Sequence, residues 1–295
     1  MQKSNTKLNG APQKVGQFQE AWLRLRRNKL AMAGLAVIIL LFLIAIFADV
    51  FFDYDTVVIE QNTAIRLQPP SAEHILGTDE FGRDILARIV HGSRVSLSVG
   101  IISVVFALLV GGAIGAVAGF VGGKVDDILM RIMDILLAIP SLLLSITIVS
   151  ALGQSLFNLV LAISISFVPS FSRTVRAAVM TGKDKDFVES ARCIGAINFE
   201  IILQHILPNC LATIIVDASL KIATSILTIS GLSFLGLGVK APMPEWGAML
   251  SGGRAYMRQS LYLTLFPGLA IVITILSFNL LGDGLRDALD PKLKK

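Results

Sequence analysis

Long, uninterrupted runs of apolar residues recur along the chain, separated by shorter polar segments. Each run comes near the ~20 residues that an α-helix needs to cross the hydrocarbon core of a bilayer. Amphipathic helices and half-buried strands would instead alternate apolar and polar positions within these stretches. The pattern predicts an all-α membrane protein with six transmembrane helices, at residues 30–48, 95–120, 128–151, 155–171, 211–235 and 261–281.

The composition agrees with a lipid environment. Hydrophobic residues make up 54% of the 295 residues and charged residues only 16%, whereas soluble domains carry about 25% charged residues. Basic residues precede the first run, as they do in a signal peptide: Arg24, Arg26, Arg27 and Lys29. The run itself exceeds the ~7–15 apolar residues of a signal peptide and no small-residue cleavage site follows it, so we expect a retained helix.

The basic residues also predict the orientation. With the amino terminus inside, the inner segments are residues 1–29, 121–127, 173–210 and 282–295, and the outer ones are 49–94 and 236–260. The inner segments hold 17 lysines and arginines and the outer ones 7. Because basic residues accumulate on the cytoplasmic side of a membrane, both termini are predicted to face the cytoplasm.

Several classes of protein are disfavoured by what the chain lacks. The net charge of +5 comes from residues between apolar runs, with no basic stripe interleaved with aromatics, so no nucleic-acid partner is expected. The cysteines and histidines are too scattered for a metal site, and both cysteines are expected to be reduced. These residues are Cys193, Cys210, His74, His91 and His205.

The second apolar run contains glycines four residues apart, at Gly111, Gly115 and Gly119. Such a row lies on one face of a helix and lets a neighbouring backbone approach closely, so it predicts tight helix packing. The Gly122-Gly123-Lys124 sequence that follows is not a phosphate-binding loop, because Ala118 and Val125 occupy the required glycine and Ser/Thr positions. Any ATP chemistry is therefore expected on another chain.

The inner segment 173–210 is too long for a simple connector. A short helix is expected around Glu189, Ser190 and Ala191, and Gly195 is expected to end it. Apolar residues then recur at helical spacing, at Phe199, Ile202, Leu203 and Ile206. This second helix lacks the Lys/Arg-rich polar face of a membrane-surface helix, so a groove on a protein is the expected partner of its apolar face.

This segment resembles the signature of permease subunits of binding-protein-dependent ABC importers, which reads Glu-Ala-Ala, three residues, Gly, nine residues, Ile-x-Leu-Pro. The matching residues are Glu189, Ala191, Gly195, Leu207 and Pro208, whereas Ser190 and His205 depart from the pattern. Further blocks resemble the C-type subunit of the dipeptide/oligopeptide/nickel group: LGTDEFGRD from Leu76, LSFLGLG from Leu232, PEWGAML from Pro244, and FNLLGDGLRDALDPKLK near the end. The resemblance thus extends over nearly the whole chain.

The resemblance implies a type I ABC importer permease fold in the inner membrane of a bacterial cell. It implies a heterodimer with a B-type permease, two cytosolic ATPases that bind ATP and magnesium, and an external solute-binding protein. The coupling helix that the ATPases grip would include Glu189, Ala191, Gly195, Phe199, Leu207 and Pro208. The division expected is residues 1–94, with the first span and outer loop, and a permease core at 95–295 that contains the coupling loop 173–210.

Charged residues inside the fifth span are candidates for the translocation pathway. Asp217 and Lys221 are one helical turn apart, and charges at such depth usually pair or face a wet cavity. Either a structural pair or a contact with the charged ends of a cargo fits this spacing. Outside the membrane, Asp79, Arg83, Asp84 and Arg88 are expected on a solvated amphipathic helix, and Trp246 as an anchor at the membrane interface.

Two other functions and several cargoes compete with peptide import. An intramembrane serine protease would need a histidine near Ser233 on another span, but all three histidines lie outside the predicted spans. A secondary transporter would show inverted repeats, and none is visible. Within the importer group, glutathione or chelated nickel are alternative cargoes to di- and oligopeptides. Pro140 and Pro169 are expected to kink the third and fourth spans.

Overall fold

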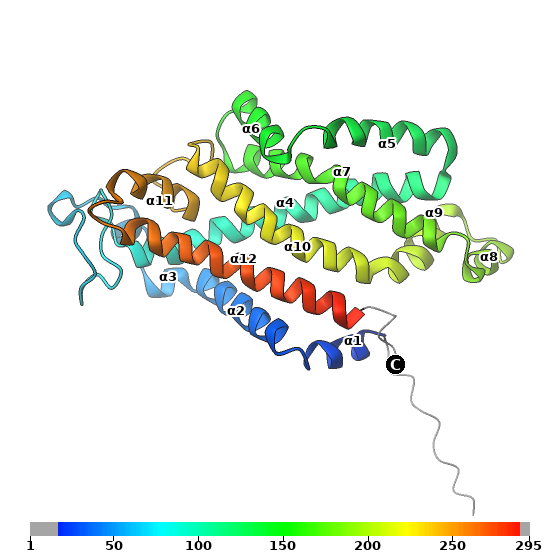
Figure 1. The fold of residues 1–295 in the computed structure, drawn as a ribbon, viewed down its shortest axis with the longest axis horizontal. Helices are drawn as coiled ribbons and strands as arrows, with labels where there is room; N and C mark the ends of the chain where they lie inside the picture. Colours follow the sequence, from blue (N-terminus) through cyan, green and yellow to red (C-terminus); the bar gives the residue numbers. More distant parts are fainter. Residues whose placement is uncertain (1–16, 290–295) are drawn as a thin grey trace, which may run out of the picture.

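Figure 1 shows a bundle of long helices that run side by side, with short helices and loops gathered at the two ends. This computed structural model describes residues 17–289. The long helices are α2 (Lys29–Ile46), α4 (Ile85–Val121), α7 (Leu156–Gly182), α10 (Leu207–Phe234) and α12 (Tyr262–Leu289). The other elements are α1 (Gln17–Leu25), α3 (Ala48–Phe51), η1 (Tyr54–Ile59), η2 (Thr63–Ile65), α5 (Gly123–Leu137), α6 (Ser141–Leu152), α8 (Asp186–Cys193), α9 (Asn198–Glu200), η3 (Ile201–Ile206), α11 (Trp246–Gly253) and η4 (Arg254–Tyr256).

Within the described residues, five helices are long and apolar enough to cross a membrane, and they correspond to five of the six predicted spans. Several extend beyond the apolar run that predicted them, and α4 begins ten residues earlier, at Ile85. Asp84 caps its start by accepting a hydrogen bond from the Ala87 amide at 2.9 Å. Apolar length therefore locates this span, while the capping residue in the polar segment before it sets where α4 begins.

The third predicted span, 128–151, is two helices and not one. The axes of α5 and α6 are bent by 85° at a break between Leu137 and Ser141. Pro140 lies in this break and lacks the N–H that would continue the hydrogen-bond ladder. The interruption lies at Pro140, as expected, but it is a break between two helices and not a kink within one. Hydropathy does not register the break, because apolar residues continue through it. The described part of the chain has six candidate spans only if this bent pair counts as one.

The glycine row of α4 packs against α7, as predicted. A Cβ built on Gly111, Gly115 or Gly119 would lie 2.6, 2.2 or 2.8 Å from a carbonyl oxygen of α7. These carbonyls belong to consecutive turns of α7, so the two helices touch backbone to backbone along several turns. Only glycine leaves room for this approach.

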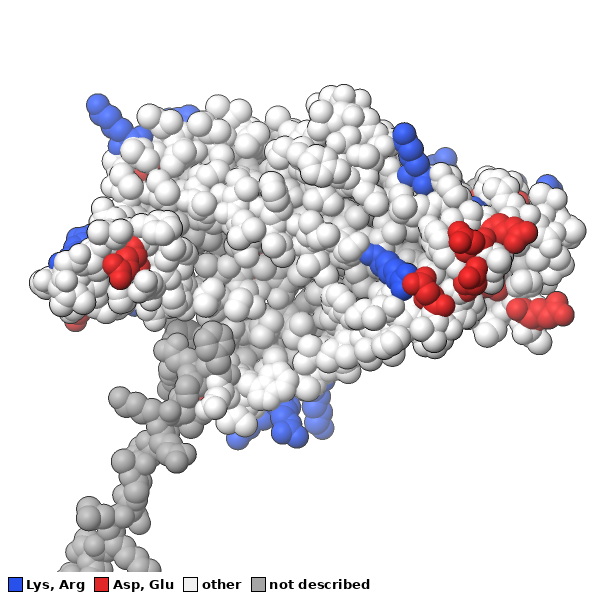
Figure 2. All heavy atoms as spheres, turned by 180° about the vertical axis from the view of Figure 1, so that it is seen from behind, with Lys and Arg blue, Asp and Glu red and all other residues white. Residues whose placement is uncertain are grey.

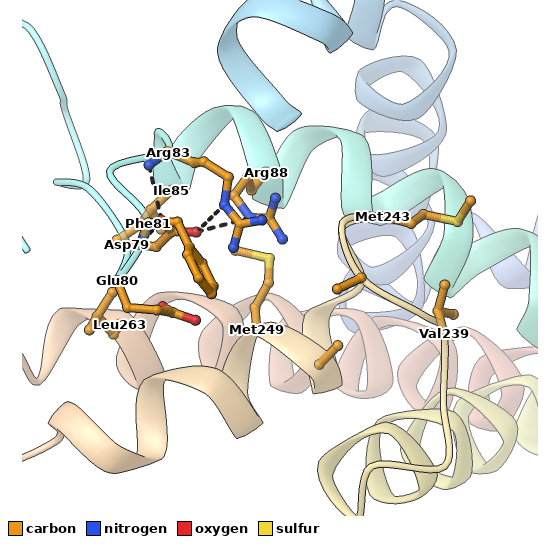
Figure 3. A pocket seen from close by; sticks show the side chains of 12 residues that line it. Asp79, Glu80, Phe81, Arg83, Ile85, Arg88, Val239, Met243, Met249 and Leu263 are labelled. Carbon is orange, nitrogen blue, oxygen red and sulfur yellow. Dashed lines mark hydrogen bonds and ion pairs between the residues drawn. The ribbon is translucent and has the colours of Figure 1, made fainter. Parts of the chain in front are cut away.

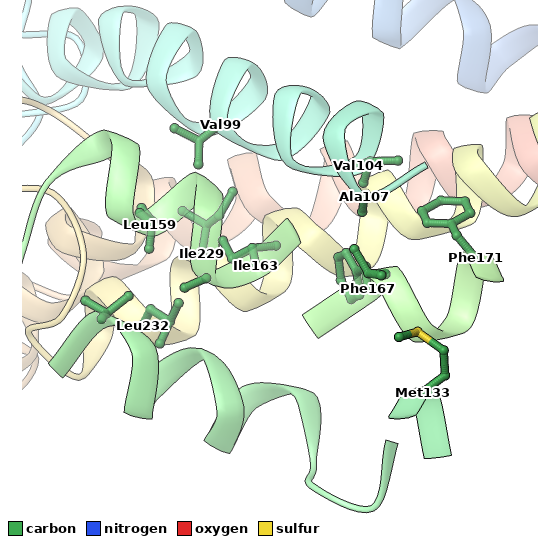
Figure 4. Packing of buried hydrophobic residues seen from close by; sticks show 13 residues of the cluster. Val99, Val104, Ala107, Met133, Leu159, Ile163, Phe167, Phe171, Ile229 and Leu232 are labelled. Carbon is green, nitrogen blue, oxygen red and sulfur yellow. The ribbon is translucent and has the colours of Figure 1, made fainter. Parts of the chain in front are cut away.

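The largest apolar cluster lies between α4, α7 and α10 (Figure 4). Its buried members from α7 are Leu159, Ile163, Phe167, Val168 and Phe171. Met133 of α5 reaches the same cluster, so the first half of the broken span is packed against the bundle. Close packing of this kind, rather than exclusion from water, holds helices together within a bilayer.

The segments predicted to share one side of the membrane gather at the same end of the bundle. The α4–α5 turn, α8 and the last turn of α12 lie at one end, whereas η1 and α11 lie at the other (Figure 1). Seen from behind, a wide surface without charge covers the middle of the molecule, acidic residues gather toward its ends, and basic residues lie there and along its lower edge (Figure 2). Residues 1–16 and 290–295, which contribute to the predicted orientation, lie outside the described part of the chain.

Candidate functional site

The inner segment forms a helix, a tight turn and a second helix. α8 ends at Cys193, and Gly195 has a φ of +89°. The Gly195 amide donates to the Arg192 carbonyl at 3.0 Å, and the Ala196 amide donates to the Ala191 carbonyl at 3.1 Å. This pair of bonds is the Schellman ending of a helix, which places a residue of left-handed conformation at the position of Gly195. The Glu-x-Ala-x-x-x-Gly spacing thus encodes the end of α8.

One side of this segment is anchored in the bundle. Val188, Ala191, Ile201 and Ile206 are buried in a second apolar cluster, which includes Val175 and Val179 of α7. Ala191 is 3% exposed, and a small side chain suits this contact between α8 and its neighbours. The segment is therefore held against α7 and α10 rather than tethered loosely between them.

The other side is open and apolar. Ile194, Ile197 and Phe199 are 84%, 66% and 67% exposed. The predicted single face of Phe199, Ile202, Leu203 and Ile206 divides in the structure, since Ile206 is buried and Phe199 and Leu203 are exposed. Glu189 also lies on the surface. The exposed apolar surface is centred on the turn between the helices, which periodicity within the second helix did not indicate.

Leu207 and Pro208 begin α10, which continues directly from η3. The Leu207 amide donates to the Ile202 carbonyl, five residues back, and Pro208 has no N–H to donate. A wider π turn just before the proline absorbs this loss. A cavity of about 690 Å³ opens beside these turns. Its polar lining residues include Thr174, Thr181, Lys185, Asn209, Cys210 and Thr213.

The structure brings Asp217 and Lys221 together at the α7–α10 contact. Lys221 Nζ lies 3.7 Å from Asp217 Oδ1, and Thr174 of α7 donates a hydrogen bond to Asp217 Oδ2 at 3.0 Å. The Lys221 ammonium also lies 5.5 Å from the centre of the Phe171 ring, within cation–π range. The side chains keep 18% (Lys221) and 24% (Asp217) exposure, so the pair is accessible from one side.

At the opposite end, three charged residues form a buried cluster (Figure 3). Asp79 Oδ2 lies 2.7 Å from Arg83 Nε and 3.4 Å from Arg88 Nε. Arg88 also donates to the carbonyls of Val58, at 2.8 Å, and Pro242, at 3.3 Å. The expected solvated helix was wrong here, because Asp79, Arg83 and Arg88 are only 6%, 5% and 6% exposed. They join three segments that lie far apart in the sequence.

Trp246 is likewise not a membrane anchor. It is fully buried, and its Nε1 donates to the Ile89 carbonyl at 3.0 Å. The preceding Glu245, also fully buried, caps α11 by accepting hydrogen bonds from the Gly247 and Ala248 amides at 3.0 and 2.8 Å. Sequence reasoning missed Glu245, because glutamate, unlike aspartate, is not among the usual capping residues. These contacts fix α11 on α4.

Glu80 borders a cavity of about 150 Å³ beside this cluster (Figure 3). Burial raises the pKa of its carboxyl above the ordinary value of 4.5. Because the folded chain then binds the proton more tightly than the unfolded chain, stability falls as the pH rises through this interval. We expect Glu80→Gln to raise the unfolding temperature at about pH 7.5 and to have no effect near pH 4.

The measurement is thermal unfolding of the purified protein in detergent at both pH values. Glu60→Gln, which changes an exposed carboxylate of the same outer segment, is the matched control. A loss of stability in Glu80→Gln at neutral pH would contradict the prediction.

Comparison with known proteins places this geometry in a family. Residues 111–295 match the inner membrane component of binding-protein-dependent transport systems. Residues 16–70 match the N-terminal transmembrane domain of oligopeptide transport permease C. The dipeptide transport system permease protein DppC of Alkalihalophilus pseudofirmus is 50% identical over 280 residues, which cover 95% of this chain and 91% of that protein.

Two further relatives are similar over nearly their full lengths. The di/tripeptide transport system permease protein DppC of Pseudomonas aeruginosa is 45% identical, with 94% of this chain and 93% of that protein covered. The glutathione transport system permease protein GsiD of Pectobacterium atrosepticum is 44% identical, with 94% and 92% covered.

A solved structure shares the fold. A chain from inward-facing conformations of the MetNI methionine ABC transporter superposes with a TM-score of 0.58 at 18% identity, covering 70% of this chain and 98% of that chain. The predicted type I ABC importer permease fold is confirmed. This chain is a multi-pass membrane protein that belongs to the inner membrane components of binding-protein-dependent ABC transport systems, with an N-terminal domain of the oligopeptide permease C type.

Proposed function

We propose that this chain is one of two pore-forming subunits of an ATP-driven importer whose cargo is di- or oligopeptides. The related permeases are named for dipeptide, di/tripeptide and glutathione transport. These cargoes are peptides with charged ends. Peptide import is therefore the function that the relatives favour over nickel.

The observation that carries the coupling role is the exposed apolar turn between α8 and α9. Ile194, Ile197 and Phe199 point away from a base that is buried against α7 and α10. An exposed apolar patch on a rigid base suits a protein partner. In this proposal a cytosolic ATPase grips the turn, so that movement driven by ATP reaches α7 and α10 through the buried base.

The remaining subunits follow from the same proposal. A B-type permease completes the pore, two ATPases bind ATP and magnesium, and an external binding protein delivers cargo to residues 49–94 and 236–260. The chain itself catalyses no reaction, its two parts are residues 1–94 and 95–295, and both termini lie in the cytoplasm. Asp217 and Lys221 are proposed to meet the charged ends of the cargo, since both keep partial exposure.

The test is reconstitution of the four kinds of subunit in liposomes with a library of dipeptides. We expect ATP hydrolysis to rise when loaded binding protein is added, and labelled dipeptide to accumulate only with hydrolysable ATP. Uptake driven by an ion gradient without ATP would contradict the proposal and favour a secondary transporter. If only glutathione or only chelated nickel stimulated ATP hydrolysis, that compound would be identified as the cargo in place of dipeptides.

The turn at Gly195 gives a sharper prediction. A Cβ at Gly195 would meet nothing within 4 Å, so a substitution there strains the backbone without a clash. The strain at positive φ is roughly 1–2 kcal/mol, largest for β-branched residues and smallest for asparagine. We expect Gly195→Val to reduce cargo-stimulated ATP hydrolysis severalfold and Gly195→Asn to retain most of it. Equal losses in the two variants would show that conformation at this position is not the cause.

A further inference from the structure

α5 presents three distinct faces. One face is buried against the bundle and carries Asp126 and Met133. A second carries charged residues spaced three and four apart: Lys124, Asp127, Arg131 and Asp134. The third carries Val125, Ile128, Ile132 and Ile135, which are 41%, 61%, 48% and 62% exposed. Because this spacing keeps residues on one side of a helix, the charged and apolar faces form separate stripes along α5.

The charged stripe of α5 is linked to α7 by an ion pair. α5 runs alongside α7 (Figure 1), and Asp134 lies roughly 16 Å along the helix from Gly123 at 1.5 Å per residue. Asp134 pairs with Arg173 of α7 at 2.5 Å, and these side chains are 45% and 56% exposed. Asp134 lies within the third predicted span, 128–151, and a charge there avoids lipid and faces protein or a water-filled space. The isoleucine stripe, in contrast, suits contact with lipid.

The break that follows α5 is a second, independent reason to expect water beside the charged face of this helix. Within residues 17–289, the carbonyls of Leu137, Ala138 and Ile139 accept no hydrogen bond from the turn that follows. Ala138, Ile139 and Pro140 are exposed. Irregular backbone at membrane depth is tolerated only where protein covers it or where it borders water. Water can satisfy these carbonyls directly, whereas a partner would need donors matched to each.

A contact through α7 connects this face with the other charged residues of the spans. Arg173, which pairs with Asp134, is followed by Thr174, which donates to Asp217. Thr174 also borders the cavity of about 690 Å³. Adjacent residues of α7 therefore contact the charged face of α5 and the Asp217–Lys221 pair, and the second of them borders the cavity.

We propose that the charged face of α5, with Arg173 and the break at Ala138–Pro140, lines the water-filled pathway through which the cargo passes. The proposal rests on the proposed import function and adds a location that neither the hydropathy pattern nor the Asp217–Lys221 pair indicated. Alternating acidic and basic groups along α5 suit a cargo that carries both charges, as a peptide does at its two ends. The isoleucine face of the same helix then lies against lipid.

Cysteine accessibility tests this assignment. In the assembled transporter, with Cys193 and Cys210 replaced by serine, single cysteines are placed by Arg131→Cys and Ala138→Cys. Ile132→Cys and Ile135→Cys are matched controls on the neighbouring face. Each variant is treated with a membrane-impermeant trimethylammonium methanethiosulfonate. Because the reagent needs a hydrated thiolate, we expect the first pair to react about tenfold faster than the controls, and added dipeptide to slow only the first pair.

Co-purification with the other subunits verifies assembly of each variant, and Asp127→Cys is a second reporter on the charged face. Equal reaction rates on the two faces, or faster reaction of Ile132→Cys and Ile135→Cys, would overturn the assignment. Dipeptide uptake is measured on the same vesicles. A fast-reacting charged face without uptake retains the pathway and contradicts the peptide cargo, whereas uptake with equal rates contradicts the pathway alone.

Discussion

Gly115→Ala is expected to prevent the chain from accumulating as a folded protein. A Cβ at this position would lie 2.2 Å from the Ser172 carbonyl oxygen and 2.9 Å from the Arg176 amide. Both contacts are backbone atoms of α7, so no side chain can turn aside and α4 and α7 must separate. Overpacking in an ordinary core costs about 1–3 kcal/mol, and displacement of two helix backbones places this variant at or above that range. The measurement is the yield of monodisperse protein in detergent after expression at matched levels.

Gly112→Ala provides the matched control for the backbone contact between α4 and α7. It adds the same methyl group to the same helix, but the new Cβ would meet only side-chain atoms of Leu108 and Val175, both at 3.9 Å. Its yield is expected to equal that of the parent protein. If both variants are recovered equally well, close backbone contact between α4 and α7 is not what limits the stability of the bundle.

Asp79→Ala is expected to release the outer segments from the bundle. The Asp79 carboxylate faces two arginines that are 5% and 6% exposed, and it also accepts hydrogen bonds from the amides of Phe81 and Arg83 at 2.9 and 3.0 Å. Removing one partner of a buried ion pair typically costs about 3–5 kcal/mol, because the remaining charge is left without compensation. The expected result is a lower unfolding temperature and rapid proteolysis within residues 53–84.

Two variants separate charge from other effects. Asp55→Ala removes an exposed carboxylate from the same outer region and is expected to leave proteolysis unchanged. Asp79→Asn keeps an oxygen that can accept the two amide hydrogen bonds but removes the charge, so its loss of stability measures the contribution of the two arginines. Parent-like stability in Asp79→Asn would contradict the importance of charge pairing at this position.

The spans and the inner segment were predictable because their signals are local. Apolar length located the long helices, the glycine row marked the face of α4 that another helix approaches, and Gly195 marked the end of α8. In each case the deciding residues lie within a few turns of one another. The physical cause, whether lipid exposure, close backbone approach or positive φ, therefore acts on a continuous stretch of sequence.

The features that were missed depend on contacts between distant residues. The partners of Arg88 at Val58 and Pro242 are 30 and 154 residues away, so nothing near Arg88 distinguishes a buried cluster from a solvated helix. The burial of Trp246 was missed for the same reason, because its contact with Ile89 of α4 spans 157 residues. The full break before α6 was missed for a different reason. Ala138 and Ile139 are as apolar as the helices beside them, and Pro140 alone predicts only a kink.

The length of α4 has a consequence for energetics. This helix continues unbroken through 37 residues, roughly 55 Å at 1.5 Å per residue, with Arg88 near one end and Gly119 against Arg176 at the other. Events at opposite membrane surfaces then act on one stiff body. Thermodynamic linkage requires reciprocity: if nucleotide binding changes the affinity for the external binding protein by some factor, docking of that protein changes nucleotide affinity by the same factor. The two affinities, measured on opposite sides of the membrane, are expected to report a single coupling free energy.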